Sequence, residues 1–104
     1  MIVEERIYTL VMGAAPEYLR LYEAGGLEIQ RRVLGRLVGY YSVETGPLNQ
    51  VVHLWAYDSP EDRARRRATL TADPGWQAYV KTIRPLIISQ ENKLLVPAPF
   101  SPKH

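Results

Sequence analysis

The stretch GPLNQVVHLWAYDSP at residues 46–60 constrains the fold more than any other part of the chain. Its Gly-Pro pair and Asn49 are typical of a turn, and residues 51–57 are typical of a β-strand. Successive strand residues point to opposite faces. One face then carries Val51, His53, Trp55 and Tyr57, and the other carries Val52, Leu54 and Ala56. Neither face is polar enough to be left in water, so both should be covered by other parts of the protein.

Three further strands are predicted by β-branched and aromatic residues, over residues 2–11, 37–45 and 86–96. The turn at residues 46–49 joins the second of these to the strand 51–57 as a hairpin. Strict alternation places Leu37 and Tyr41 on one face and Tyr40 on the other. One of the two tyrosines should therefore lie on the same face of the sheet as His53.

The region between the first two strands is predicted to be helical, because apolar residues recur at steps of three and four over residues 19–33. Pro16 suits the first turn of this helix. Gly25 and Gly26 lie inside the apolar stripe, where glycine weakens a helix. We interpret the pair as a close approach of one helix to the sheet, with a break between two shorter helices as the alternative.

A second helical region follows the strand 51–57. Ser59 is a good N-cap and Pro60 a good first residue. The Asp-Pro pair at residues 73–74 interrupts the region and starts a second amphipathic segment, which ends at Pro85.

The order of elements is β-α-β-β-α-β, which predicts an α+β, ferredoxin-like fold: a four-stranded antiparallel sheet with helices on one face. We assign residues 1–96 to this single domain and residues 97–104 to an irregular, proline-rich C-terminal tail. Since the helices cover one face, the other would expose apolar and aromatic side chains. A second copy of the chain is the expected cover, so we expect a two-fold symmetric homodimer.

The composition limits the classes of function. A chain of 104 residues with a net charge of +2 lacks the basic excess that indicates nucleic-acid binding. It has no cysteine, which excludes disulfides and thiolate metal sites, and no metal-ligand spacing of histidines and carboxylates. No apolar stretch reaches the ~18 residues of a membrane span, and the acidic N-terminus is unlike a signal peptide. We therefore expect a cytoplasmic protein with no metal, cofactor, membrane or nucleic-acid partner.

His53 is the candidate catalytic residue, because the ordinary pKa of histidine, about 6.5, suits a general base or a ligand. A buried histidine hydrogen-bonded within the sheet or across a dimer interface is the more common arrangement. No serine or cysteine motif typical of a catalytic nucleophile accompanies it. Tyr40, Trp55 and Tyr57 are candidate ligand-binding residues that would line an aromatic pocket, or they belong to the core or an interface.

Three polar candidates remain. Asn49 could offer an amide donor at the mouth of a pocket, or it could cap the turn with its side chain. Arg63, Arg66 and Arg67 fall within one helical turn and could bind a carboxylate or phosphate, although a solvated helix face is the usual explanation. Arg84, beside a proline, could point its guanidinium toward a cavity.

Several motifs in this chain resemble the NIPSNAP family. They are YEAGGL at residues 22–27, GRLVGY at 35–40, GPLNQVVHLWAY at 46–57, and then Arg63, Arg66-Arg67 and DPGW at 73–76. The resemblance covers nearly the whole chain, and it implies a dimeric α+β barrel. Small bacterial members of the family mostly lack an assigned activity. Larger mitochondrial relatives in animals are linked to vesicle traffic and mitochondrial quality control, and they carry sequence that this chain lacks.

Two classes of function follow. In the first, a homodimer of the NIPSNAP type binds a small apolar or aromatic molecule in a cavity between sheet and helices. Its enzymatic form would be a cofactor-independent monooxygenase, which the resemblance to the wider barrel superfamily suggests, with His53 taking a proton from the substrate. In the second, the protein is a non-catalytic interaction or scaffold protein, and the aromatic strand joins two copies. Whether the protein is an enzyme stays open.

Overall fold

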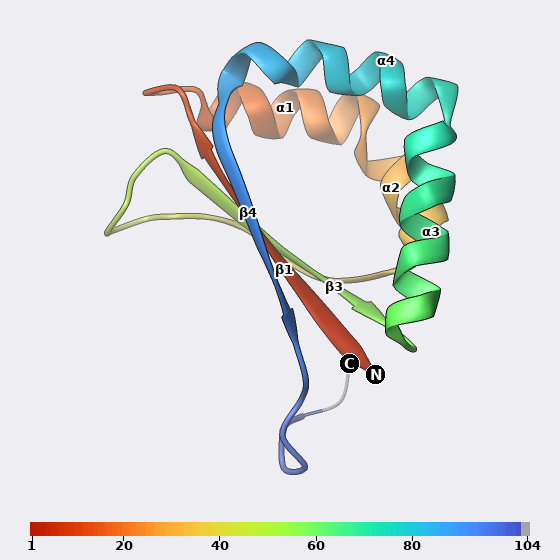
Figure 1. Cartoon of the computed structure of the whole chain (residues 1–104). Coiled ribbons are helices and arrows are strands. Elements are labelled where there is room, and N and C mark those ends of the chain that lie inside the picture. Colours follow the sequence, from red (N-terminus) through yellow and green to blue (C-terminus); the bar gives the residue numbers. More distant parts are fainter. Residues whose placement is uncertain (103–104) are drawn as a thin grey trace.

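The computed structural model describes residues 1–102 and has the α+β architecture predicted from the sequence (Figure 1). The four strands are β1 (Ile2–Leu10), β2 (Arg36–Ser42), β3 (Gln50–Tyr57) and β4 (Ile87–Leu95). The helices are α1 (Ala15–Gly25), α2 (Leu27–Leu34), α3 (Pro60–Ala72), α4 (Pro74–Ile83) and the short 3-10 turn η1 (Arg84–Leu86). All strand pairs are antiparallel, in the order β2-β3-β1-β4. This is the ferredoxin-like topology, so the predicted fold class is confirmed.

The helices lie on one side of the sheet, where α1 contacts α4 and α2 contacts α3 (Figure 1). We call the helix-covered side of the sheet its inner face and the other side its open face. The inner face of β3 consists of Val51, His53, Trp55 and Tyr57, and each is at most 1% exposed. The aromatic side of the central sequence stretch is therefore core, beneath the helices, and cannot join two sheets through their open faces.

β2 departs from strict alternation at Val38. Leu37 pairs with Trp55 and Gly39 pairs with Leu54, so Val38 forms a β-bulge with no partner of its own. The extra residue puts Leu37 and Tyr40 on the same face, where alternation predicted opposite faces. Tyr40 pairs with His53, which confirms that one tyrosine of the pair lies beside the histidine.

The first helical region is broken at Gly26, so the continuous helix favoured from the sequence is wrong and the alternative is correct. A Cβ atom on Gly26 would lie 2.8 Å from the ring of Tyr79, on α4, and 3.0 Å from the ring of Tyr22. The close approach expected at this glycine exists, but its partner is an aromatic ring on another helix rather than the sheet. The chain turns where this ring leaves no room for a side chain.

The second helical region follows its sequence signals. The Ser59 hydroxyl accepts a hydrogen bond from the Asp62 amide at 3.0 Å and caps α3. The Asp73 carboxylate accepts one from the Trp76 amide at 2.9 Å and caps α4. Within residues 1–102, none of the helices is long and apolar enough to cross a bilayer. The predicted tail has no regular structure over residues 97–102, and its last two residues lie outside the described part.

Candidate functional site

A cavity of about 420 Å³ lies between the inner face of the sheet and the helices. All four strands and the helices α1 to α4 contribute at least one residue to its walls. Its polar walls are formed by Arg6, Tyr8, Gln30, Tyr40, His53 and Arg67. Val80 and Ile83 of α4 add an apolar wall. Exposed residues of β4 and Arg84 border the cavity where it meets solvent. A cavity of this volume is within the range of small-molecule sites.

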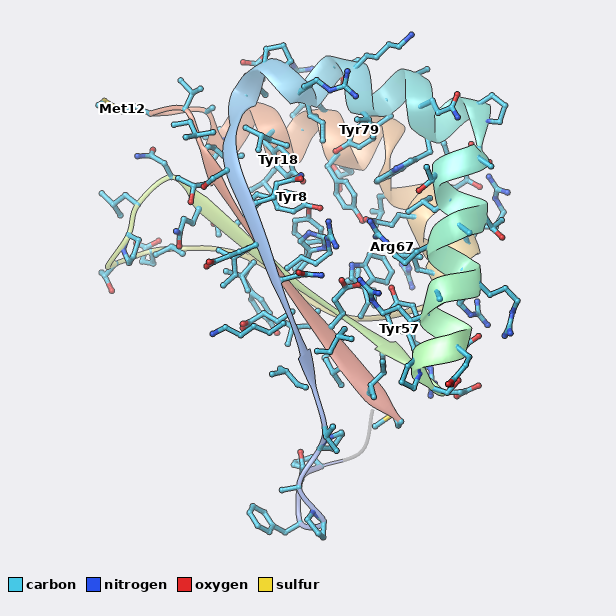
Figure 2. All side chains as sticks on the ribbon, viewed as in Figure 1. Tyr8, Met12, Tyr18, Tyr57, Arg67 and Tyr79 are labelled. Atoms are coloured by element: carbon cyan, nitrogen blue, oxygen red, sulfur yellow. The ribbon has the colours of Figure 1, made fainter. Side chains whose placement is uncertain are left out.

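Tyrosine rings form much of this cavity. Tyr22 stacks on Tyr40 with ring centres 4.5 Å apart, and the hydroxyls of Tyr18 and Tyr40 are 2.8 Å apart in a hydrogen bond. The Tyr22 hydroxyl donates to the Gln30 side-chain oxygen at 2.6 Å. Burial raises the pKa of Tyr18, Tyr22 and Tyr40, so these phenols are neutral. Figure 2 shows Tyr18 and Tyr8 in the space between sheet and helices.

His53 lies at the floor of the cavity with its ring fixed on three sides. It stacks on Tyr40 at 4.4 Å, and Tyr8 packs edge-on at 5.0 Å. Trp55 donates its indole N–H to Nδ1 of His53 at 2.8 Å. Because Nδ1 accepts this bond, the neutral imidazole carries its proton on Nε2. That Nε2 atom is buried and has no hydrogen-bond partner within residues 1–102.

This geometry does not fit the general-base role expected for His53. Burial, together with the charges of Arg6 and Arg67, lowers the pKa of His53 to about 3. A base of such low pKa takes up a proton poorly at neutral pH. The nitrogen free to face a ligand already carries a proton. His53 is therefore arranged to donate a hydrogen bond to a bound molecule, and Trp55 determines which nitrogen does so.

A buried charge cluster lies next to the tyrosines. Glu4 is fully buried, and its Oε2 accepts hydrogen bonds from Arg63 at 2.7 Å, Asn92 at 2.8 Å and Arg6 at 3.0 Å. Burial raises the pKa of Glu4, but the bonds from Arg63 and Asn92 and the two guanidinium charges outweigh it and lower the pKa to about 2. Arg6 also donates to the Tyr8 hydroxyl at 3.0 Å. The carboxylate is ionised, and its Oε2 atom is held by three hydrogen bonds.

The predicted arginine cluster of α3 divides between two sides of the helix. Arg63 binds Glu4, whereas Arg66 binds Asp62 at 3.0 Å and the backbone oxygen of Val33 at 3.1 Å. Arg67 points toward the sheet and into the cavity (Figure 2). One of its terminal nitrogens, Nη1, is buried with no partner among the described residues. Burial and the charge of Arg6 lower the pKa of Arg67, which nevertheless remains a cation.

The structure brings together three of the six residues chosen from the sequence. Tyr40, His53 and Arg84 line the cavity. Trp55 lies behind His53 and orients it, and Tyr57 lies further along β3, where its hydroxyl is 3.4 Å from Glu4 Oε1. These two residues therefore support the site without lining it.

Asn49 lies apart from the cavity. Its side-chain oxygen accepts a hydrogen bond from the Gly13 amide at 2.9 Å, and its backbone oxygen accepts one from Leu10 at 2.7 Å. Its φ of 68° is left-handed, a conformation that asparagine tolerates in turns. The side chain of Asn49 therefore caps a turn, but it is the turn that follows β1 and not its own.

Sequence reasoning missed the residues of β1, α1 and α2 that complete the site. Glu4, Arg6 and Tyr8 alternate along β1 and so share the inner face. Opposite charges at Glu4 and Arg6, which share one face of a strand rich in β-branched residues, were the available signal, because such charges are rarely buried unless paired. Tyr18 and Gln30 gave no comparable signal.

Within residues 1–102, no three histidine, cysteine or carboxylate side chains group closely enough to hold an ion. One ring nitrogen of His53 is already bonded to Trp55.

A family model and solved structures of related proteins match nearly the whole chain. The family model described as NIPSNAP matches residues 3–102. A crystal structure of an uncharacterized NIPSNAP-like domain protein from Burkholderia xenovorans is 56% identical, with a TM-score of 0.96 over 98% of this chain and 89% of that one. A NipSnap protein of Caenorhabditis elegans is 34% identical over 92% of this chain, which spans only 18% of that relative's length. A structure described as a putative antibiotic biosynthesis monooxygenase from Nitrosomonas europaea has a TM-score of 0.68 over 93% of this chain and 98% of that one. Its sequence is only 10% identical, so the likeness shows a shared fold alone.

Proposed function

The chain belongs to the NIPSNAP family, and from that premise we propose that it is a homodimer that binds a small, largely apolar or aromatic molecule in the cavity between sheet and helices. One observation carries the proposal: the rings of Tyr8, Tyr18, Tyr22 and Tyr40 line a cavity of about 420 Å³ that also contains a buried, unpartnered donor on His53. Stacked rings offer flat apolar contacts, and a few buried polar groups fix orientation.

The proposal concerns binding and leaves the reaction open. Monooxygenase-like turnover is the enzymatic alternative, and it rests on the fold likeness alone. In either case His53 would contact the ligand through its Nε2 proton, stabilising an acceptor oxygen rather than removing a proton.

The homodimer is supported by the open face. Val3, Ile7, Val52 and Leu54 share that face by their strand register, and Tyr41 beside them is 56% exposed. Within residues 1–102, no helix covers this side of the sheet (Figure 1). A second copy presents the same apolar strips, which is the arrangement that a two-fold interface needs.

Native mass spectrometry of freshly purified protein is the first test, since it reads the oligomer and any bound mass together. A thermal-shift screen with one-ring and two-ring aromatic compounds follows. We expect a dimer whose melting temperature rises with at least one class of aromatic compound.

A matched pair of variants on α4 locates the binding. Val80→Trp fills the cavity from its wall and should abolish the thermal shift, whereas Lys81→Trp, exposed on the same helix, should leave it unchanged. If Val80→Trp binds the aromatic compounds as the unaltered protein does, the cavity is not their site and the proposal fails.

A further inference from the structure

Two of the buried donors that lack a partner within residues 1–102 lie in the walls of the same cavity. They are Nε2 of His53 and Nη1 of Arg67. Buried N–H groups are almost always hydrogen-bonded, because an unpaired one loses its water without replacement. Two such donors in one cavity, one from β3 and one from α3, indicate an acceptor that the protein itself does not supply.

The charge around these donors is unbalanced. Arg6, Arg63 and Arg67 lie around one carboxylate, that of Glu4, and only the first two bind it. In the part of the chain that the structure describes, Arg67 has no acidic partner. Arg6, His53 and Arg67 all line the same cavity, so two guanidinium groups and the imidazole face one space. An anion placed there would be attracted in a poorly solvated site, where charge interactions are strong.

The rest of the cavity favours a flat apolar group. Tyr22, Tyr40 and His53 form one continuous stack, with ring centres 4.5 Å and 4.4 Å apart. Val80 and Ile83 close the helix side. Guanidinium groups pair with carboxylates in a planar, two-point geometry, which suits an acid attached to a ring.

We propose that the cavity binds an aromatic carboxylate, whose oxygens accept hydrogen bonds from Nε2 of His53 and from the guanidinium of Arg67 while its ring packs on the tyrosine stack. This inference rests on the proposed function and names its ligand class. Trp55 is a positioning residue in this site, since its bond to Nδ1 keeps the proton of His53 on the ligand side.

Calorimetric titration with acid and amide pairs tests the inference. The probes are benzoate and 2-naphthoate, each compared with its primary amide, and acetate as an anion without a ring. We expect each aromatic acid to bind about 10- to 100-fold more tightly than its amide, because hydrogen bonds to charged groups are the stronger ones. Acetate should bind far more weakly than benzoate.

Arg67→Gln should remove most of the preference for each acid over its amide, because glutamine keeps a hydrogen-bond donor and loses the charge. Amide binding then reports that the variant is folded and its cavity intact. Arg65→Gln is the control, because Arg65 lies on the same helix, has a 71% exposed side chain and binds Asp62 instead. Arg67→Lys, which keeps the charge and loses the planar fork, should restore part of the preference for the acid.

The outcomes separate this inference from the proposed function. Equal binding of acid and amide would overturn the carboxylate site while leaving the aromatic cavity in place. An acid preference that survives in Arg67→Gln would also overturn the inference. Binding of none of the aromatic probes, acid or amide, would overturn both, and acetate binding as tightly as benzoate would show a simple anion site.

Discussion

Glu4 is the single residue on which the buried charge cluster depends. Glu4→Gln should lower the free energy of unfolding by about 3 kcal/mol at pH 7, because it leaves the half-buried Arg6 and Arg63 without a counter-charge. The pH dependence follows from the pKa, which is about 2 in the folded chain and ordinarily 4.5. The unfolded chain takes up the proton first, so the stabilisation is complete above pH 4.5 and is lost as the pH falls toward 2.

Urea unfolding of both proteins between pH 2.5 and 7 checks this expectation. The difference between them should shrink steadily below pH 4.5. Glu5→Gln is the matched control, because Glu5 is the next residue of β1 but lies on the open face and has no ion pair within residues 1–102. If Glu5→Gln lowered the free energy of unfolding by a similar amount, the effect would come from the change in net charge and not from the ion pairs of Glu4.

The protonation of His53 gives a second prediction at this scale. Two-bond ¹⁵N–¹H spectra should show one neutral tautomer, protonated on Nε2, without change between pH 5 and 8. The reasons are the bond from Trp55 to Nδ1 and a pKa lowered to about 3 by burial and neighbouring arginines. Trp55→Phe removes the donor and should mix the tautomers. A titration of His53 near pH 6.5 would contradict the structure.

These residues also show which parts of the site the sequence could predict. Position in a strand could be predicted, so one of Tyr40 and Tyr41 was expected on the face of His53, and the pairing of β2 with β3 shows that it is Tyr40. Partners across the fold were not readable, because Glu4 is 59 residues away from the Arg63 that it binds and 88 from Asn92. The low pKa of His53 comes from its burial and from the charges of Arg6 and Arg67. Neither cause could be predicted from the sequence, from which His53 was expected to act as a base.

At the scale of elements, Gly26 and Gly25 form a natural comparison. Gly26→Ala should destabilise the fold by about 2 kcal/mol, because its Cβ would come within 2.8 Å of the Tyr79 ring. Gly25→Ala places its Cβ at 3.4 Å, an ordinary contact, and should remain within about 1 kcal/mol of the unaltered protein. Thermal unfolding measures both. Equal destabilisation in the two variants would mean that the contact with the Tyr79 ring does not select glycine at position 26.

The elements themselves were largely predictable from local signals. The cap at Ser59, the interruption at Asp73-Pro74 and the alternation of β3 appear in the structure as expected. The bulge at Val38 was not predictable, because a bulge is a property of the pairing between two strands and leaves no mark on one of them. The helix break at Gly26 could not be predicted with certainty for a similar reason, because it depends on the ring of Tyr79 on another helix, α4.

At the scale of the whole molecule, the open face determines the oligomer that we propose. Leu54→Glu places a charge among the apolar residues of that face and should convert the dimer to a particle near the chain mass of 11.9 kDa. Light scattering after size exclusion measures this mass. Lys81→Glu, on the outer surface of α4, should leave the dimer intact. A dimer that survives Leu54→Glu would place the interface elsewhere.

The strand order has a consequence for how the chain reaches its native state. β1 pairs with β3 on one side and with β4 on the other, so Val3 lies opposite both Ala56 and Leu95. Such distant pairings close slowly, because the chain must lose much of its freedom before the contacts form. During synthesis β1 therefore leaves the ribosome long before its second neighbour exists, and the ligand cavity stays without one border until β4 arrives. We expect ligand binding to be among the last properties that a growing or refolding chain acquires.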